Sequence, residues 1–234
     1  MARREGGFTL IEILVVVTII GVLMGMVALI APLAFKRREE TTTQTRVQKV
    51  AVAITQLANR NALGWYPPTG TENLRDVNNA KIGKDLGPGN EFNRGIETAV
   101  IALHLNGLDV TIDLEEDALR NWDGDQMPGS NPTRLGTNDR WEIVDAWRVP
   151  LAYFSSADYK KPDAYKKIQL ENGDVIEVKP WIRKKTGLFV NPDSFQLFSA
   201  GPDGIFNTPD DMGNWESSRQ EDEEEEAAAE GEGE

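Results

Sequence analysis

Residues 8–35 read FTLIEILVVVTIIGVLMGMVALIAPLAF, and from Ile13 to Phe35 this run has 23 residues without a charge. Apolar runs longer than ~18 residues are typical of membrane-spanning helices. As a helix that rises ~1.5 Å per residue, the run reaches about 35 Å, enough to cross a hydrocarbon core of ~30 Å with some tilt. The sequence therefore predicts that residues 8–35 form a transmembrane helix.

The residues before this run differ from an ordinary secretory signal. A short basic leader is followed by the small pair Gly6-Gly7, which stands before the apolar run. A secretory signal has its small residues and its cleavage point after that run. With Phe8 next and Glu12 as the fifth residue after Gly7, the segment resembles the leader and mature start of the type IV pilin and pseudopilin superfamily.

This resemblance implies that residues 1–7 are a leader peptide that a prepilin peptidase removes. The peptidase would cut between Gly7 and Phe8 on the cytoplasmic side and methylate the new amine of Phe8. Glu12 would neutralise the N-terminal amine of an adjacent subunit as the helices pack into a filament. An alternative stays open for Glu12, because an acidic residue in the first turn of a helix is favourable to the helix dipole without any role in assembly.

The composition excludes several functions. The 234 residues include 25 Lys and Arg against 38 Asp and Glu, which gives a net charge of −13. Neutralising phosphates requires clustered cations, so we expect no nucleic-acid partner. The absence of Cys excludes disulfides and Cys-ligated metals, and the single His104 does not support a multi-His metal site or a Ser-His-Asp hydrolase.

The negative charge is concentrated at the C-terminus. Residues 216–234 hold ten carboxylates and one Arg, so they carry nine of the thirteen surplus negative charges. Like charges at this density repel each other and bury no apolar surface. We therefore predict a disordered acidic tail over residues 216–234.

Helical periodicity continues beyond the apolar run. Apolar residues at positions 47, 50, 54, 57 and 58 are spaced by three and four, which predicts that residues 36–64 are an amphipathic continuation of the same helix. We expect the helix to end near Leu63-Gly64, because Gly and then Pro commonly follow a helix end. A globular head is predicted over residues 65–215, with a second helix over Asn93–Asn106 and an insertion or enlarged loop over about 90–139.

Several segments of the head have the pattern of strands, namely residues 145–153, 167–170, 174–178 and 194–199. The middle two flank Glu171-Asn172-Gly173, and Asn-Gly between alternating residues is a strong hairpin signal. We therefore predict an α+β fold, in which a small antiparallel sheet packs on the C-terminal half of the long helix.

Two segments of the head resemble the major pseudopilin of the type II secretion system in particular. Tyr66–Leu74 has the Tyr-Pro-x-Thr-x-x-Glu-x-Leu arrangement of the loop after its long helix. Asp145–Tyr153 is similar to its Asp-x-Trp-Gly-x-Pro-x-x-Tyr segment, although Arg148 stands where that family usually has Gly. We interpret this replacement as a sign of a less tight turn.

Leu197–Trp215 holds three aspartates between Gly and Pro turns. Carboxylates and backbone carbonyls are hard oxygen ligands, which suit calcium. The segment resembles the calcium-binding loop of the major pseudopilin. That resemblance implies calcium ligands from the side chains of Asp203, Asp210 and Asp211 and from the backbone oxygens of Leu197, Ser199 and Met212. The competing interpretation is a polar turn whose aspartates bond to nearby backbone N–H groups.

A second acidic motif occupies residues 121–125, where Asp123 and Asp125 flank Gly124. Such an Asp-x-Asp could meet a cation. An EF-hand, however, needs a longer series of ligands that ends in Glu, and this series is missing. We interpret the motif as a solvated turn.

These observations favour a structural, non-enzymatic subunit of a periplasmic pseudopilus in type II protein secretion. The implied partners are further copies in a helical filament, minor pseudopilins, the inner-membrane assembly platform, prepilin peptidase and the membrane. The chain would span the inner membrane once, with its C-terminal head in the periplasm.

Two other functions stay open. The first is a type IV pilus or minor pilin subunit that takes part in adhesion or contacts a substrate. The second is a membrane-tethered hydrolase that uses two carboxylates, although no pair with the required separation can be identified from the sequence.

Overall fold

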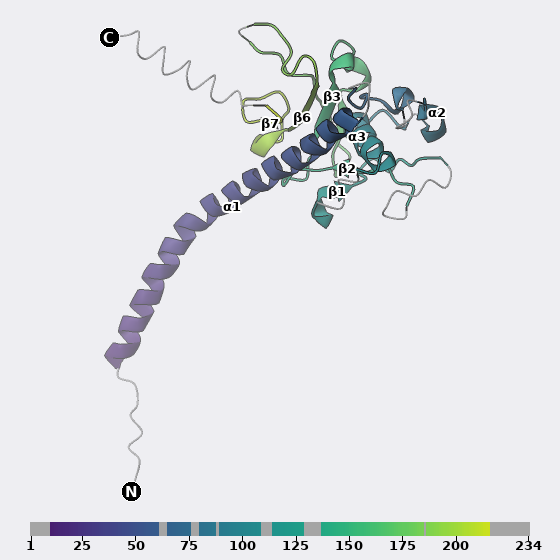
Figure 1. The fold of residues 1–234 in the computed structure, drawn as a ribbon. Coiled ribbons are helices and arrows are strands. Elements are labelled where there is room, and N and C mark those ends of the chain that lie inside the picture. The colour runs from purple at the N-terminus through teal and green to yellow at the C-terminus, as the bar shows by residue number, and fades with distance from the viewer. Residues whose placement is uncertain are drawn as a thin grey trace, which may run out of the picture. The chain divides into compact units, whose positions relative to one another are not determined.

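The computed structural model describes residues 10–60, 65–75, 80–87, 89–108, 114–128, 137–184 and 186–215. The chain divides into two compact units, residues 1–39 and residues 40–234. Helix α1 (Leu10–Arg60) contributes its first part to one unit and its second part to the other (Figure 1). The predicted leader and acidic tail lie outside the described residues.

The first unit contains the apolar part of α1. Leu10–Ala28 forms 19 helical residues with a mean hydropathy of 2.7, and none of them is buried. The hydroxyl of Thr18 donates to the carbonyl oxygen of Leu14 at 2.8 Å, so the hydroxyl in the middle of this segment is satisfied within the helix. By length and composition this segment can cross a membrane.

The second unit is built on the rest of α1. Val47, Val50, Ile54 and Leu57 are fully buried in one core cluster, which confirms the predicted amphipathic continuation. The described helix ends at Arg60, and the predicted end near residues 63–64 lies outside the described residues.

Helix α3 (Arg94–Leu105) confirms the predicted second helix and contributes six of its twelve residues to the same core cluster as α1. It lies within the range 90–139, which we expected to be an insertion or enlarged loop. α3 is the second helix that the sequence predicts within this range, and the assignment of the range as an insertion stays a prediction. The rest of the described range consists of loops, a 3₁₀ turn at Glu116–Ala118 and the short strand β1 (Leu119–Arg120).

The central sheet has the order β3 (Ala152–Ser155), β6 (Phe195–Ser199), β7 (Met212–Gly213), and all its pairs are antiparallel. Tyr153 pairs with Leu197 in the register of β3 and β6. Side chains of a strand alternate between faces. Accordingly, Tyr153 and Leu197 join the core with α1 and α3, whereas Phe154 and Phe198 join a second core cluster on the other face. Both faces are covered, so β6 is buried along its whole length.

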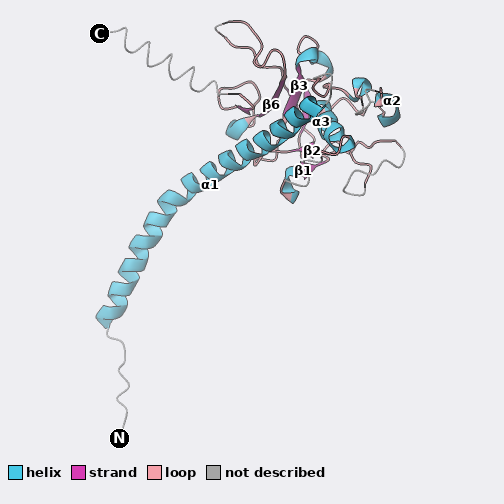
Figure 2. Ribbon diagram, viewed as in Figure 1, coloured by secondary structure: helices cyan, strands magenta, loops and turns pink. Residues whose placement is uncertain are grey.

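The predicted single sheet is divided into separate small sheets. β1 pairs with β2 (Glu142–Ile143), and β4 (Lys167–Gln169) pairs with β5 (Val175–Glu177). The second pair is the predicted Asn-Gly hairpin, with Gly173 at φ 84°. Most of the head between these strands is loop (Figure 2). The remaining helical elements are α2 (Gly83–Leu86) and 3₁₀ turns at Thr71–Asn73, Glu116–Ala118, Ser156–Asp158, Pro162–Ala164 and Gly201–Asp203.

The strand that we predicted over residues 145–153 begins only at Ala152. Before it, Asp145 closes a turn, since its Oδ1 accepts the N–H groups of Trp147 and Val149, both at 2.9 Å. Arg148 lies in this turn with φ 69°, the left-handed conformation that glycine adopts most easily. Arg148 therefore adopts a conformation that is typical of glycine, and its N–H closes the turn by donating to the carbonyl oxygen of Asp145 at 3.2 Å. A looser turn than the one with Gly stays a prediction.

Candidate assembly and cation-binding sites

The candidate assembly residue Glu12 lies in the first turn of α1 and is exposed. A carboxylate at this end of a helix interacts favourably with the helix dipole. The candidate processing residues Gly7 and Phe8 lie outside the described residues. Further along the helix, no atom lies within 4 Å of the position that a Cβ would take at Gly21 or Gly25. Residues this small at a spacing of four allow close approach of a second helix.

The C-terminal loop, residues 200–211, connects β6 with β7. Oδ1 of Asp203 accepts the N–H of Ile205 at 2.7 Å, and Oδ2 of Asp210 accepts the N–H of Asp203 at 3.2 Å. The hydroxyl of Thr208 donates to Oδ1 of Asp210 at 2.5 Å. Asp203 and Asp210 thus both make hydrogen bonds within the loop.

Asp211 differs from the other two aspartates because it points into the head. It is 4% exposed, and its Oδ2 accepts Nε1–H of Trp181 at 2.7 Å and the N–H of Asn207 at 2.9 Å. Its Oδ1 is buried without a hydrogen-bond partner. Burial raises the pKa of Asp211 to about 7. One buried oxygen at the base of the loop is therefore available to a cation.

The predicted backbone ligands lie on the two strands that the loop connects. Ser199 pairs with Met212 across β6 and β7, and the carbonyl of Leu197 accepts the N–H of Asn214 at 3.0 Å. This donor set consists entirely of oxygen atoms, which fits calcium. Within the described residues, however, the three carboxylates whose ligand atoms lie within 4.8 Å of one another belong to a different group and not to this loop.

That group is the buried acidic cluster, which we define as Glu97, Asp123 and Glu142. One carboxylate oxygen from each residue lies within 4.8 Å of the other two. Glu97 comes from α3, Asp123 from the turn after β1, and Glu142 from β2. Three segments that are distant in sequence thus bring their carboxylates to one point in the head.

The three carboxylates differ in their partners. Oε1 of Glu142 accepts Nδ2–H of Asn93 at 2.8 Å, and its Oε2 accepts the N–H of Trp122 at 2.9 Å. Oδ1 of Asp123 accepts the N–H of Asp125 at 3.3 Å, whereas its Oδ2 is buried without a hydrogen-bond partner. Glu97 is 1% exposed, and neither of its carboxylate oxygens has a hydrogen-bond partner.

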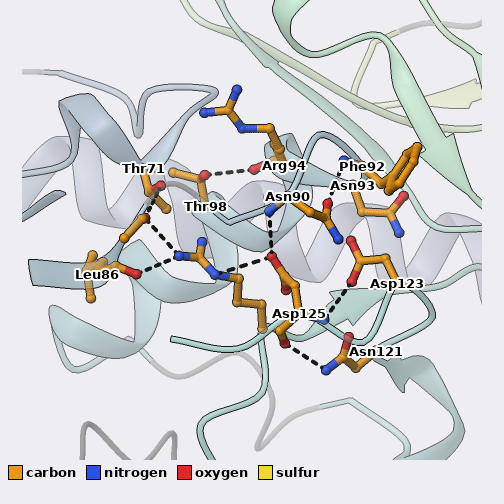
Figure 3. A network of polar contacts seen from close by, with 12 residues as sticks. Thr71, Leu86, Asn90, Phe92, Asn93, Arg94, Thr98, Asn121, Asp123 and Asp125 are labelled. Carbon is orange, nitrogen blue, oxygen red and sulfur yellow. Dashed lines mark hydrogen bonds and ion pairs between the residues drawn. The ribbon is translucent and has the colours of Figure 1, made fainter. Parts of the chain in front are cut away.

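A neighbouring ion pair compensates a fourth carboxylate, that of Asp125. Its Oδ2 accepts the N–H of Asn90 at 3.1 Å and lies 3.4 Å from Nε of Arg140. Nη2 of Arg140 donates to the carbonyl oxygens of Leu86 and Gly87 at 2.6 and 2.8 Å. Figure 3 shows Asp125 between Asn90 and the turn at residues 121–123. The guanidinium group is thus anchored on Asp125 and on two carbonyls.

Burial dominates the electrostatics of this region. It raises the pKa of Glu97 well above its ordinary value, and the negative charges of Asp125, Asp123 and Glu142 raise it further. Burial also raises the pKa of Glu142 to about 8, although hydrogen bonds from Trp122 and Asn93 lower it. The carboxyl groups of Glu97 and Glu142 therefore need protons or a cation at neutral pH.

Sequence reasoning missed Glu97 and Glu142 as site residues. It identified the Asp123–Asp125 motif but favoured a solvated turn, whereas Asp123 faces two buried glutamates. The available signal was weak: Glu97 follows Ile96 and precedes Ala99 and Val100 within a helix whose apolar residues cover several sides. The sequence of such a helix does not show whether its charged residue is buried, because burial depends on the neighbours of that residue in space.

A groove of about 710 Å³ lies between α1 and the segment that carries β6 and β7. Its lining includes Gln48, Val52, Tyr66, Phe195 and Trp215 and contains no Asp or Glu. A glycosidase needs two carboxylates that flank a sugar-binding cleft. This groove therefore does not supply the carboxylate pair that the hydrolase hypothesis requires.

Comparison with known proteins supports the N-terminal assignment. Residues 2–28 match the protein-family model described as the prokaryotic N-terminal methylation motif. The match covers the predicted processing point, Glu12 and the apolar part of α1, and it supports a type IV pilin-like N-terminus that a prepilin peptidase processes. No curated protein and no solved structure gives a significant match to the chain.

Proposed function

We propose that this protein is a structural subunit of a pseudopilus in type II protein secretion. The observation that carries the proposal is the methylation motif over residues 2–28 together with a helix, Leu10–Ala28, that buries none of its apolar residues within the chain. Exposed apolar surface on this scale requires lipid or other protein. The membrane would cover this apolar surface before assembly, and the helices of neighbouring subunits would cover it after assembly.

In this proposal the chain spans the inner membrane once and places its head in the periplasm. Its partners are prepilin peptidase, further copies of the chain, minor pseudopilins and the assembly platform of the inner membrane. The subunit works by polymerisation and not by catalysis. Glu12 supplies the specific contact, because a carboxylate within an apolar environment is stabilised by pairing with the methylated amine of Phe8 in the next subunit.

The decisive experiment combines processing and assembly in the cell. Mass spectrometry of the membrane-bound protein is expected to find a mature chain that begins with methylated Phe8. Glu12→Ala is expected to insert into the membrane and to be processed but to be lost from filaments, whereas Glu12→Asp, which keeps the charge, retains assembly. Normal incorporation of Glu12→Ala would contradict the charge-pairing role, and an intact leader in assembled protein would contradict the pilin-like pathway.

We further propose that calcium stabilises the C-terminal loop. The buried, partnerless Oδ1 of Asp211 supports this proposal. The further ligands that we propose are the carboxylates of Asp203 and Asp210 and the backbone oxygens of Leu197, Ser199 and Met212, which are all hard oxygen donors. A bound cation would neutralise the buried carboxylate of Asp211. Because the chain has no Cys, no disulfide can close this loop in its place.

Chelation tests the loop site. EDTA is expected to lower the melting temperature of the purified full chain, and Asp203→Ala is expected to reduce that response. Asp193→Ala, an exposed aspartate outside the loop, serves as the matched control and should respond like the wild type. If Asp203→Ala and Asp193→Ala respond equally, the loop is a polar turn and not a calcium site.

The alternative function is a type IV pilus or minor pilin subunit. The predicted insertion or enlarged loop over about 90–139 favours this alternative, because it would offer surface for contact with a substrate or another surface. The genomic neighbourhood separates the two functions. A secretion ATPase and an outer-membrane secretin of the type II system beside the gene support the pseudopilus, whereas pilus genes there support the alternative.

A further inference from the structure

We propose that Glu97, Asp123 and Glu142 form a second divalent-cation site, separate from the C-terminal loop and best suited to Ca²⁺. The site is carried by geometry, since one oxygen from each carboxylate lies within 4.8 Å of the other two. Calcium binds oxygen ligands at ~2.3–2.6 Å, so two ligands on opposite sides of the ion are about 5 Å apart. The cluster therefore has the dimensions of a single coordination shell.

The second, independent observation is the state of Glu97. This side chain is 1% exposed, and both of its carboxylate oxygens are buried without a hydrogen-bond partner. Burying a carboxylate without a partner is costly, so such groups are paired or coordinate a metal. Oδ2 of Asp123 faces the same problem, because it is also buried without a partner. These oxygens are the ones that a cation would bind.

The neighbouring protein cation does not fill this role. Arg140 directs its Nε to Asp125 and its Nη2 to the carbonyls of Leu86 and Gly87. No hydrogen bond or ion pair described for Arg140 reaches Glu97, Asp123 or Glu142. Its charge acts on Glu97 from a distance only. Asp125 thus has an ion pair with Arg140, whereas none of the ion pairs among the described residues includes Glu97, Asp123 or Glu142.

The ligand chemistry selects the kind of ion. All three ligands are hard carboxylate oxygens, which disfavours ions that prefer sulfur or imidazole. Glu142 is held in place by Asn93 and by the N–H of Trp122, and Asn93 is itself tied to Gln169 N–H at 3.0 Å. Mg²⁺ demands shorter distances and near-octahedral geometry, whereas Ca²⁺ tolerates irregular shells from three separate segments. A bound ion would join α3, β2 and the turn after β1.

The test uses the full chain in detergent with the loop site disabled by Asp203→Ala. In this background, Ca²⁺ is expected to raise the melting temperature by several degrees over EDTA, because a ligand that binds only the folded state stabilises it. Adding Glu97→Gln, which is uncharged and of the same size, is expected to abolish the rise and to remove one bound Ca²⁺ per chain in equilibrium dialysis. Glu116→Gln, an exposed glutamate, is the matched control and should keep both.

Two outcomes would overturn the proposal. One is a melting temperature that is the same in Ca²⁺ and EDTA for the Asp203→Ala chain. The other is an unchanged Ca²⁺ response and stoichiometry after Glu97→Gln, which would make the cluster a set of protonated buried acids. If the Glu97→Gln chain does not fold, Asp123→Asn takes its place, because Asp123 is only partly buried and its loss removes one ligand.

Discussion

The hydroxyl of Ser199 donates a hydrogen bond of 2.5 Å to Oδ2 of Asp145, and both residues are almost completely buried. The other oxygen of Asp145 closes the turn before β3 through the N–H groups of Trp147 and Val149. Ser199 Oγ accepts the N–H of Gly201 at 3.0 Å, where the C-terminal loop begins. This pair therefore connects the turn before β3 with the start of the loop that we propose to bind calcium.

Ser199→Ala is expected to destabilise the head by about 1–3 kcal/mol, because it leaves the N–H of Gly201 and one oxygen of Asp145 buried without a partner. All six tryptophans lie between residues 65 and 215, so urea unfolding followed by tryptophan fluorescence reports on the head in the full chain. Thr45→Ala, which removes an exposed hydroxyl bonded within α1, is the control and should change stability by no more than about 0.5 kcal/mol. Equal effects of the two variants would contradict the role of the Ser199–Asp145 pair.

Arg46 connects α1 to the same turn before β3. Its guanidinium donates to the carbonyl oxygens of Val144 and Asp145 at 3.1 and 3.0 Å and also contacts Asp117, whose side chain is 70% exposed. Arg46→Met is expected to cost about 2 kcal/mol or more, because it removes the guanidinium donor from two buried carbonyls, of which only that of Asp145 keeps another donor, the N–H of Arg148. Asp117→Asn removes only a solvent-exposed ion pair and should cost less than about 1 kcal/mol. Urea unfolding of both variants measures the difference, and an equal cost would show that the ion pair and not the carbonyl contacts anchors the helix.

The elements that the sequence predicted are those whose signals are local. The spacing of Val47, Val50 and Ile54, the limits of α3 and the Asn172-Gly173 hairpin follow from periodicity and turn chemistry within a few residues. The structure bears out each of them. The N-terminal assignment also rests on a contiguous motif, and the match over residues 2–28 supports it.

The buried acidic cluster could not be predicted because its signal is not local. Glu97, Asp123 and Glu142 are separated by at least nineteen positions. Each is an acidic residue of the kind that ordinarily lies on the surface. Only the packing of α3 against β2 brings Glu97 and Glu142 together. Arg46 was missed for the same reason, since its partners are backbone carbonyls about a hundred residues away.

Arg148 offers a test of backbone strain. It has φ 69°, and its side chain makes an exposed ion pair with Glu171 and lies 5.4 Å from the ring centroid of Trp122. Arg148→Gly loses both contacts but relieves a conformation that costs a non-glycine residue about 1–2 kcal/mol. Arg148→Ala loses the same contacts and keeps the strain. We expect the Gly variant to be more stable than the Ala variant by about 1 kcal/mol in urea unfolding. Equal stability would show that the turn relaxes.

Substitutions at two glycines of the C-terminal loop can distinguish the effect of backbone strain from the effect of close packing. Gly201 and Gly204 have nearly the same φ, 68° and 69°. A Cβ at Gly201 would collide with the backbone oxygen of Asp210, whereas a Cβ at Gly204 would have no atom within 4 Å. Gly204→Ala is therefore expected to cost only the conformational strain of about 1–2 kcal/mol.

Gly201→Ala adds the collision to the same strain, so it is expected to unfold at a clearly lower urea concentration than Gly204→Ala. Because Asp210 is a proposed calcium ligand, the displaced backbone should also weaken the response of the melting temperature to Ca²⁺ in the Gly201→Ala chain. That response should survive in the Gly204→Ala chain. Identical urea midpoints and identical Ca²⁺ responses for the two variants would show that the loop moves away from the new methyl group without loss, and that the close approach of residues 201 and 210 is not needed to hold it.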